Sequence, residues 1–88
     1  MAHLGEFRIN TNYKYQKLSE VTGLTFESGK TYLIQTQNTA TYITSSTAPA
    51  GGGFIVNNLN PMSYTHQDGV DLYIKTLPVI GAIVNIAE

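Results

Sequence analysis

Apolar residues along this chain recur in short alternating runs rather than at helical spacing. No window sustains apolar positions three and four residues apart, whereas β-branched and aromatic residues form short runs that Gly, Asn and Pro interrupt about every eight to twelve residues. This pattern is typical of an all-β protein, and we expect almost no helix. The predicted strands are residues 6–10, 15–21, 30–37, 41–45, 54–57, 62–66, 72–76 and 82–87.

Alternation along these strands predicts which side chains face the core, because successive residues of a strand point to opposite faces. Tyr42 falls opposite Ile43, and Tyr73 falls opposite Leu72 and Ile74, so at least some of the tyrosines are expected to point outward. Ile83 lies opposite the final apolar stripe, as either an ordinary surface residue or an interface contact. The predicted core residues are Tyr32, Ile34, Phe54, Val56, Leu72, Ile74, Ile80, Ala82, Val84 and Ile86.

The connections between the strands predict hairpins in series, that is, a meander. Residues 37–40 are short enough for a hairpin loop, residues 67–71 contain the turn-forming pair Asp68-Gly69, and residues 77–81 close a third turn. Residues 45–53, which end in three glycines, are expected to form a mobile or partner-ordered loop. We therefore predict a single antiparallel β-sandwich or barrel of about seven to eight short strands.

The domain organisation follows from the absence of any repeat or change of composition. Residues 13–88 are expected to form one β-domain, and residues 1–12 are either an N-terminal docking arm or simply a first strand. An 88-residue chain without cysteine has a small core and no disulfide staples, which favours stabilisation by oligomerisation.

Charge and hydropathy exclude two classes of partner. Five basic and six acidic residues give a net charge of −1, which leaves no basic face for nucleic acid. No apolar run approaches the roughly 18 residues of a membrane span, and the N-terminus has no apolar signal segment. We expect no membrane partner and synthesis in the cytoplasm of the cell that makes the protein.

Candidate catalytic and metal sites are weak. The two histidines are His3, in the N-terminal segment, and His66, and neither has the spacing of a nucleophile triad. The order His66, Asp68, Asp71 matches no standard zinc or calcium spacing. The three glycines of residues 51–53 precede a strand and lack the Lys-Ser/Thr pair of a phosphate loop. We predict no enzyme activity, no catalytic residue, no cofactor and no metal.

Partner contacts are the remaining candidate function. The six tyrosines offer either ordinary strand packing or a surface for sugars and proteins, since a phenol combines apolar area with a polar group. The apolar residues of the first twelve positions would supply the contacts of a docking arm. Our interface candidates are Leu4, Phe7, Ile9, Tyr42, Tyr73 and Ile83.

The order of segments from residue 29 to residue 88 resembles that of small tailed-bacteriophage virion proteins of the decoration and accessory type. Residues 1–28 carry no such resemblance. The resemblance implies a small β-sandwich or barrel on the capsid or tail that oligomerises, often as a trimer. The segments that carry it are residues 30–38, 42–46, 48–49, 53–56, 63–65, 71–75 and 83–88.

The expected function is therefore structural. The resemblance implies a non-enzymatic virion protein that docks as a homo-oligomer on phage capsid or tail proteins and stabilises or decorates the particle. The alternative is a carbohydrate- or receptor-binding β-module of a tail fibre or adhesion protein, using outward tyrosines and the loop of residues 45–53.

Overall fold

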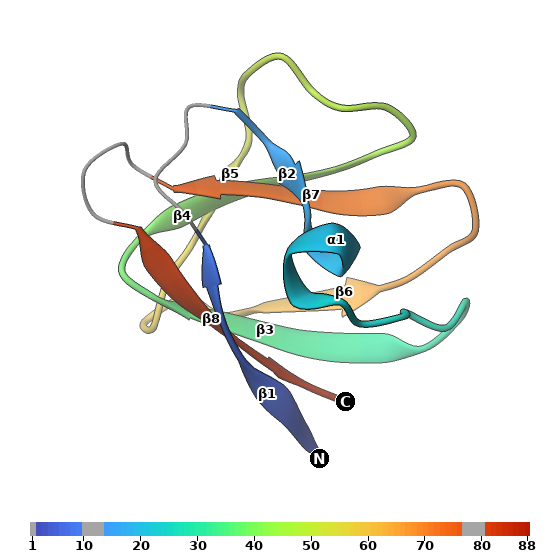
Figure 1. Ribbon diagram of the computed structural model, residues 1–88, viewed down its shortest axis with the longest axis horizontal. Coiled ribbons are helices and arrows are strands. Elements are labelled where there is room, and N and C mark those ends of the chain that lie inside the picture. Colours follow the sequence, from blue (N-terminus) through green and yellow to red (C-terminus); the bar gives the residue numbers. More distant parts are fainter. Residues whose placement is uncertain (1, 10–13, 77–80) are drawn as a thin grey trace.

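The computed structural model describes residues 2–9, 14–76 and 81–88 and contains eight strands and one short helix (Figure 1). The expectations for Tyr13, Ile80 and the turn at residues 77–80 lie outside the described residues. The elements are β1 (His3–Ile9), β2 (Gln16–Lys17), α1 (Leu18–Thr22), β3 (Thr31–Gln37), β4 (Ala40–Ser45), β5 (Phe54–Val56), β6 (Met62–Thr65), β7 (Asp71–Thr76) and β8 (Ala82–Ala87).

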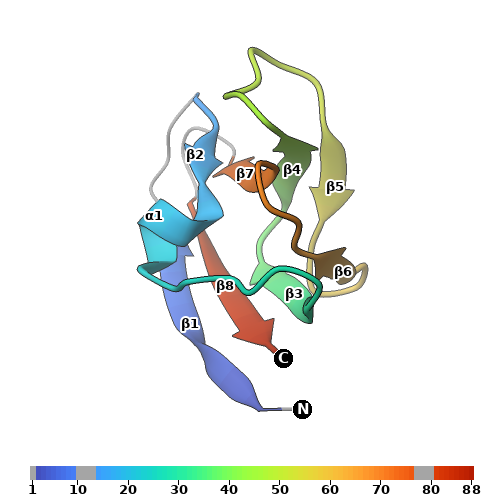
Figure 2. The same cartoon turned by 90° about the vertical axis from the view of Figure 1, so that its right-hand side faces the viewer.

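The strands form two antiparallel sheets of four strands each, which pack face to face. One sheet has the order β1-β8-β3-β6 and the other the order β2-β7-β4-β5. The predicted all-β sandwich is confirmed. Figure 2 shows β5 and β6 along one side of the sandwich, with α1 beside β1 and β2 on the other.

The connectivity is that of a long hairpin rolled into two layers. The strands pair from the outside inward, β1 with β8, β2 with β7, β3 with β6 and β4 with β5, and β8 and β7 also pair with β3 and β4. Eight strands arranged in this way form a jelly roll, one of the architectures that limit exposed sheet edges.

The predicted meander is wrong. Among the described strands, only β4 and β5 are both consecutive and hydrogen-bonded neighbours; the other consecutive pairs lie in different sheets or are not adjacent. The turn at Asp68-Gly69 does form, with Gly69 at a φ of 81° and the amide of Val70 donating to the carbonyl of Gln67. It carries the chain from β6 across to β7 in the other sheet, because local turn chemistry does not fix which sheet the next strand joins.

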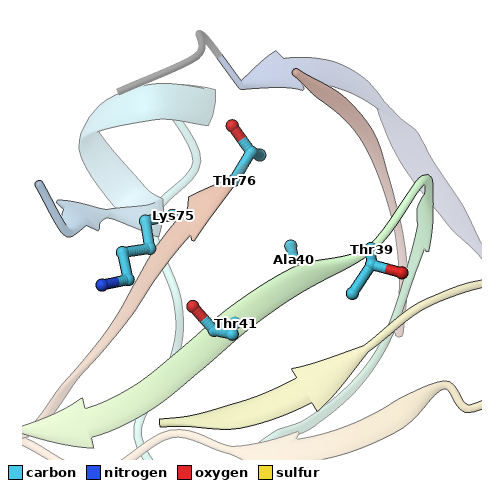
Figure 3. A pocket seen from close by; sticks show the side chains of 5 residues that line it. All are labelled: Thr39, Ala40, Thr41, Lys75 and Thr76. Carbon is cyan, nitrogen blue, oxygen red and sulfur yellow. The ribbon is translucent and has the colours of Figure 1, made fainter. Parts of the chain in front are cut away.

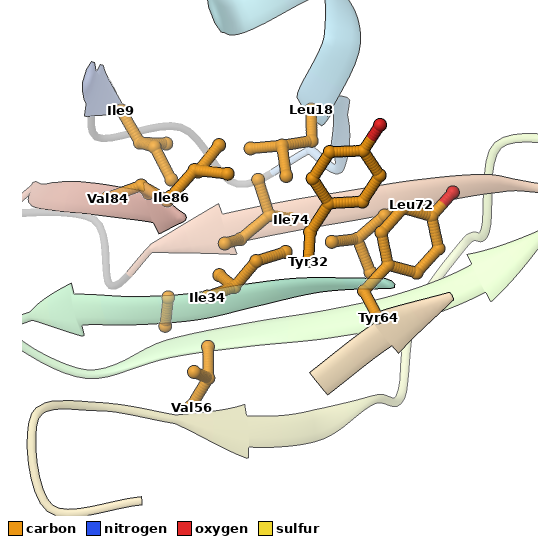
Figure 4. Close-up of a cluster of buried hydrophobic side chains, with 11 residues drawn as sticks. Ile9, Leu18, Tyr32, Ile34, Val56, Tyr64, Leu72, Ile74, Val84 and Ile86 are labelled. Carbon is orange, nitrogen blue, oxygen red and sulfur yellow. The ribbon is translucent and has the colours of Figure 1, made fainter. Parts of the chain in front are cut away.

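The core lies between the two sheets and follows the predicted alternation (Figure 4). In β3, Tyr32, Ile34 and Thr36 face inward and are buried. In β8, Ala82, Val84 and Ile86 do the same, while Ile83 is half-buried on the outer face. Phe54 is the exception: it was expected in the core with Val56, but 69% of it is exposed, because β5 is an edge strand and Phe54 lies at its open end.

Residues 15–21, predicted as one strand, form β2 and then the one-turn helix α1. Gly23 ends the helix at a φ of 73°, and its amide donates to the carbonyl of Ser19. The turn directs Leu18, which is fully buried, and the partly buried Val21 onto the core between β1 and β2. A helix of five residues is too short to produce a periodic signal in the sequence.

Candidate functional site

The N-terminal interface candidates lie in β1, which is an edge strand of its sheet and pairs with β8 from His3 to Ile9. Leu4 and Phe7 are partly buried and pack against the core, and Ile9 is 1% exposed. Of the two alternatives for this segment, the structure therefore has a first strand over residues 3–9. The Ile9 side chain has almost no area left to offer a partner.

The two tyrosine candidates lie on opposite faces of the β4–β7 sheet. Tyr42 is directly opposite Ile74, so it faces the core, where it is half-buried. Tyr42 is therefore not one of the outward-facing tyrosines, because Ile43 occupies the outer face. Tyr73 does lie on the outer face, beside Ile43, yet only 6% of it is exposed.

Tyr15 and the end of the glycine-rich loop, residues 45–53, lie on the same outer face of this sheet as Tyr73. The Tyr15 hydroxyl donates to the carbonyl of Gly52 and lies 3.4 Å from Thr41 Oγ1. The Lys75 ammonium lies 4.7 Å from the centre of the Tyr15 ring, within the range of a cation–π contact. The end of the loop predicted at residues 45–53 is thus held against the sheet by contacts within the chain.

The largest exposed apolar side chains of the described residues gather at the β5 edge. Phe54, Ile55 and Leu59 are 69%, 56% and 88% exposed, respectively. Phe54 and Ile55 are consecutive, so they point to opposite faces of β5, and the Phe54 ring lies 5.9 Å from that of Tyr42. We call these three residues the β5 apolar edge. Lone exposed apolar residues are ordinary, so it is their grouping on one edge strand and the following turn that makes these three residues candidates for an interaction surface.

The turn that follows β5 is well ordered by hydrogen bonds. The backbones of Asn57 and Asn60 exchange hydrogen bonds of 3.4 and 3.3 Å. The Asn57 side chain accepts the Leu59 amide at 2.9 Å, and the Gln35 side chain donates to the Asn58 carbonyl at 2.9 Å. These contacts hold Leu59 at the tip of a fixed turn, where its side chain faces solvent.

The β5 apolar edge belongs to a long stretch of sequence without ionised side chains. No Lys, Arg, Asp or Glu occurs between Lys30 and Asp68. This stretch includes β3, β4, β5 and β6 together with the turns that join them. The edge therefore lacks the charged residues that commonly protect a sheet edge against pairing.

His66 lies in a cluster of aromatic side chains. His66 Nδ1 lies 2.5 Å from the Tyr64 hydroxyl, and Phe26 packs edge-on against Tyr32 and Tyr64. Burial raises the pKa of Tyr64 to about 12, and the nearby Asp71 carboxylate adds to the shift. Across residues 2–9, 14–76 and 81–88, no three His, Cys, Asp or Glu side chains are grouped as metal ligands.

Two hollows on the described surface are smaller than most ligand pockets, which usually measure about 300–1,000 Å³. One, of about 100 Å³, is lined by Thr39, Ala40, Thr41, Lys75 and Thr76 (Figure 3). Its Lys75 ammonium is directed to the Tyr15 ring, away from Thr39. The other, of about 210 Å³, lies on the outer face of the first sheet beside His3 and Asn85, whose side chains are 3.3 Å apart.

The sequence predictions missed Ile55 and Leu59. Both were visible as apolar residues within the charge-free stretch, and Leu59 is the one apolar residue in the run Asn57-Asn58-Leu59-Asn60-Pro61. Alternation assigned Phe54 and Val56 to the core and left Ile55 without a role. The role of Ile83 as an interface contact stays a prediction.

Fold and surface together define a jelly-roll β-domain whose most prominent surface feature is an uncharged apolar edge. Comparison with known proteins finds no matching family model, no matching curated protein and no matching solved structure. No helix in the described part of the chain has the length and apolar character needed to cross a bilayer.

Proposed function

We propose that this chain is a non-enzymatic structural protein of a bacteriophage particle, which docks as a homo-oligomer on capsid or tail protein and stabilises or decorates the particle. The observation that carries the proposal is the β5 apolar edge: Phe54 and Ile55 lie exposed on an edge strand, and Leu59 lies exposed on the turn that follows it, all within a charge-free stretch. Such a surface suits a macromolecular partner, because burying it removes apolar area from water without desolvating any charge.

Two further points support the proposal. The segments between residues 29 and 88 resemble those of phage decoration and accessory proteins. The jelly roll is also an architecture of viral capsid domains, although this is an analogy of fold, and one fold can host many functions. A protein of this kind would act by mass action, since a ligand that binds only the assembled particle stabilises that particle.

The competing function, carbohydrate or receptor binding, depends on exposed tyrosine faces. Tyr15, Tyr32, Tyr64 and Tyr73 are buried and Tyr42 is half-buried against the core. Jelly rolls also include lectin domains, so a glycan test belongs in the same experiment.

The test is binding of the purified protein to phage particles that lack it. We expect saturable binding at a copy number that is a multiple of a capsid or tail symmetry, together with a higher temperature of particle rupture. Quantitative mass spectrometry of washed particles measures the copy number. Binding to a glycan array together with no binding to capsids or tails would overturn the proposal in favour of the carbohydrate-binding module.

A further inference from the structure

The strand β1 is an edge strand, and one of its two sides has no strand beside it in the described part of the chain. It stands first in the order β1-β8-β3-β6, and its ladder from His3 to Ile9 runs to β8. Among the described residues, no backbone hydrogen bond joins residues 3–9 to an element other than β8. The unpaired amide and carbonyl groups of such an edge are a template for another strand.

The middle of this edge is accessible despite two nearby features, the helix α1 and a bulge in the ladder. The helix lies against β1, but its Leu18 is fully buried and its Val21 packs against the core, so α1 covers the core side of the strand. Figure 2 shows α1 at the C-terminal end of β1 and no helix or strand along the rest of its free side. The bulge lies between His3 and Gly5, near the start of the strand.

The middle of β1 carries two opposite charges. Glu6 and Arg8 are both exposed and two residues apart, so they lie on the same face of the strand, the outer face of the sheet. Across the ladder Glu6 is opposite Asn85 and Arg8 is opposite Ile83, so neither meets a charge on β8. No ion pair within the described ranges includes Glu6 or Arg8. Both charges are therefore available to a strand that pairs along the free side.

The order of these two charges fits a second copy of β1 in one register. In an antiparallel pair with a two-fold axis at Phe7, Glu6 of each copy lies directly opposite Arg8 of the other. Opposite charges directly across two strands stabilise the pair, whereas like charges destabilise it. An axis at Glu6 or at Arg8 would place like charges opposite each other, and so would parallel pairing in register. Attraction in one register and repulsion in the others together select this arrangement.

The core-facing side of β1 favours the same pairing. Leu4 and Phe7 pack against the core but are only partly buried. The Phe7 ring lies over Gly5, where an added Cβ would be 3.0 Å from Phe7 Cζ. With the axis at Phe7, the two Phe7 side chains are directly opposite on one face, so the exposed parts of both rings can be buried against each other. The contact would then bury apolar area as well as match charges.

We propose that β1 pairs antiparallel with β1 of a second copy about a two-fold axis at Phe7, which joins two four-stranded sheets into one sheet of eight strands. A two-fold contact of this kind uses both β1 edges and stops at a dimer. Because β5 lies on the other side of the sandwich (Figure 2), the dimer keeps both of its β5 apolar edges exposed. The inference rests on the proposed function for the use of the dimer, since two such edges in one molecule bind a particle more tightly than one.

The first test is light scattering coupled to gel filtration, with the full chain over a range of concentrations. The wild-type protein should show a monomer–dimer equilibrium. Glu6→Arg and Arg8→Glu should each weaken association at least about tenfold, because each replaces two attractive pairs across the axis by two repulsive ones. The matched control is Asp68→Arg, which makes the same change of charge as Glu6→Arg at an exposed turn position. Circular dichroism checks that the variants fold.

The second test concerns the register and uses two forms of rescue. The double variant Glu6→Arg/Arg8→Glu restores both pairs with reversed sign, so it should associate about as well as the wild type. Mixing the two single variants should give a heterodimer, since one carries only positive and the other only negative charge at these two positions. The same light-scattering measurement follows both.

Several outcomes would overturn the dimer. They are a wild-type chain that stays monomeric, a trimer as the sole oligomer, equal weakening by Asp68→Arg, a double variant that stays monomeric, and single variants that do not associate when mixed. Particle binding is measured separately. A monomer that still binds particles would overturn the dimer and leave the proposed function standing, whereas a dimer that binds no particle would do the reverse.

Discussion

The Thr36 hydroxyl on β3 lies 3.0 Å from the carbonyl oxygen of Val56 on β5 and joins the two sheets through the core. Thr36 is fully buried, and the same hydroxyl lies 2.7 Å from the carbonyl of Asn38. A buried polar group needs a partner of this kind, because leaving it unsatisfied costs free energy. The contact is a hydrogen bond between the two sheets, and it links the short edge strand β5 to β3 of the opposite sheet.

Thr36→Val is therefore expected to lower the free energy of unfolding by about 1–3 kcal/mol, because the buried Val56 carbonyl loses the Thr36 hydroxyl as a donor while the side-chain volume stays nearly the same. Chemical denaturation monitored by circular dichroism measures the change. Thr44→Val, at an exposed position of β4, should change stability by no more than about 0.5 kcal/mol. Equal effects of the two substitutions would show that the Thr36 hydroxyl contributes nothing specific.

A second prediction concerns the glycine-rich loop. Gly53 has a φ of 124°, a backbone conformation that residues with a side chain rarely adopt. An added Cβ would also press on the Tyr15 hydroxyl and lie 3.1 Å from the Tyr42 carbonyl oxygen. Gly53→Ala should lower the free energy of unfolding by about 1–3 kcal/mol through backbone strain and contact. It should also speed hydrogen exchange in residues 46–53, since the tie to Tyr15 is lost.

Gly51→Ala is the matched control for this substitution, because a Cβ at that glycine meets nothing within 4 Å. We expect little change, or a gain of up to about 1 kcal/mol from the smaller entropy of the unfolded chain. Denaturant unfolding and exchange measured by mass spectrometry compare the two variants. If neither Gly53→Ala nor Gly51→Ala changes stability or hydrogen exchange, the loop is not held by Tyr15 in solution.

Alternation in the sequence predicted most of the core but not the topology. The stripe of Ala82, Val84 and Ile86 could be read directly, because β8 is flanked on both sides by other strands and buries one face along its length. The same rule failed for Phe54, since an edge strand buries only part of its inner face. Position within a sheet is set by long-range pairing, which a run of three residues does not encode.

The candidate site was harder to predict for the same reason. Tyr73 lies on the outer face, yet only 6% of it is exposed there. Ile55 and Leu59 become notable only once β5 is known to be the last strand of its sheet. The charge-free stretch containing them is visible in the sequence, yet it does not distinguish a buried segment from an exposed edge.

A third prediction concerns high pH. Burial raises the pKa of Tyr64 from 10.0 to about 12, so the folded protein keeps this proton where the unfolded chain has lost it. The unfolded state then binds fewer protons, and the contribution of Tyr64 to stability falls as the pH rises from about 10 to about 12; below pH 10 it is fully present. Unfolding measured across this range should show the decline.

Tyr64→Phe isolates the contribution of this one group. The variant keeps the ion pairs Lys17–Asp71 and Lys30–Glu88, so the effect of lysine deprotonation is common to both proteins. We expect the variant to be less stable at neutral pH, because it loses the contact with His66, but to lose stability less steeply above pH 10. Parallel curves for the two proteins would mean that Tyr64 titrates normally in the folded state.

The last prediction separates core from interface among the apolar residues of the first sheet. Ile9 is 1% exposed and lies in the core cluster, so Ile9→Ala should lower the free energy of unfolding by about 2–5 kcal/mol, through lost burial and the cavity left behind. Ile83→Ala should lower the free energy of unfolding clearly less than Ile9→Ala does, because Ile83 is only half-buried on the outer face of β8.

The two measurements are denaturation of the isolated protein and binding of the folded variants to particles. An Ile83→Ala variant that folds normally but binds particles weakly would assign Ile83 to the interface, whereas unchanged binding would leave it an ordinary surface residue. An Ile9→Ala variant of wild-type stability would contradict the place of β1 in the sheet and favour a detached N-terminal arm.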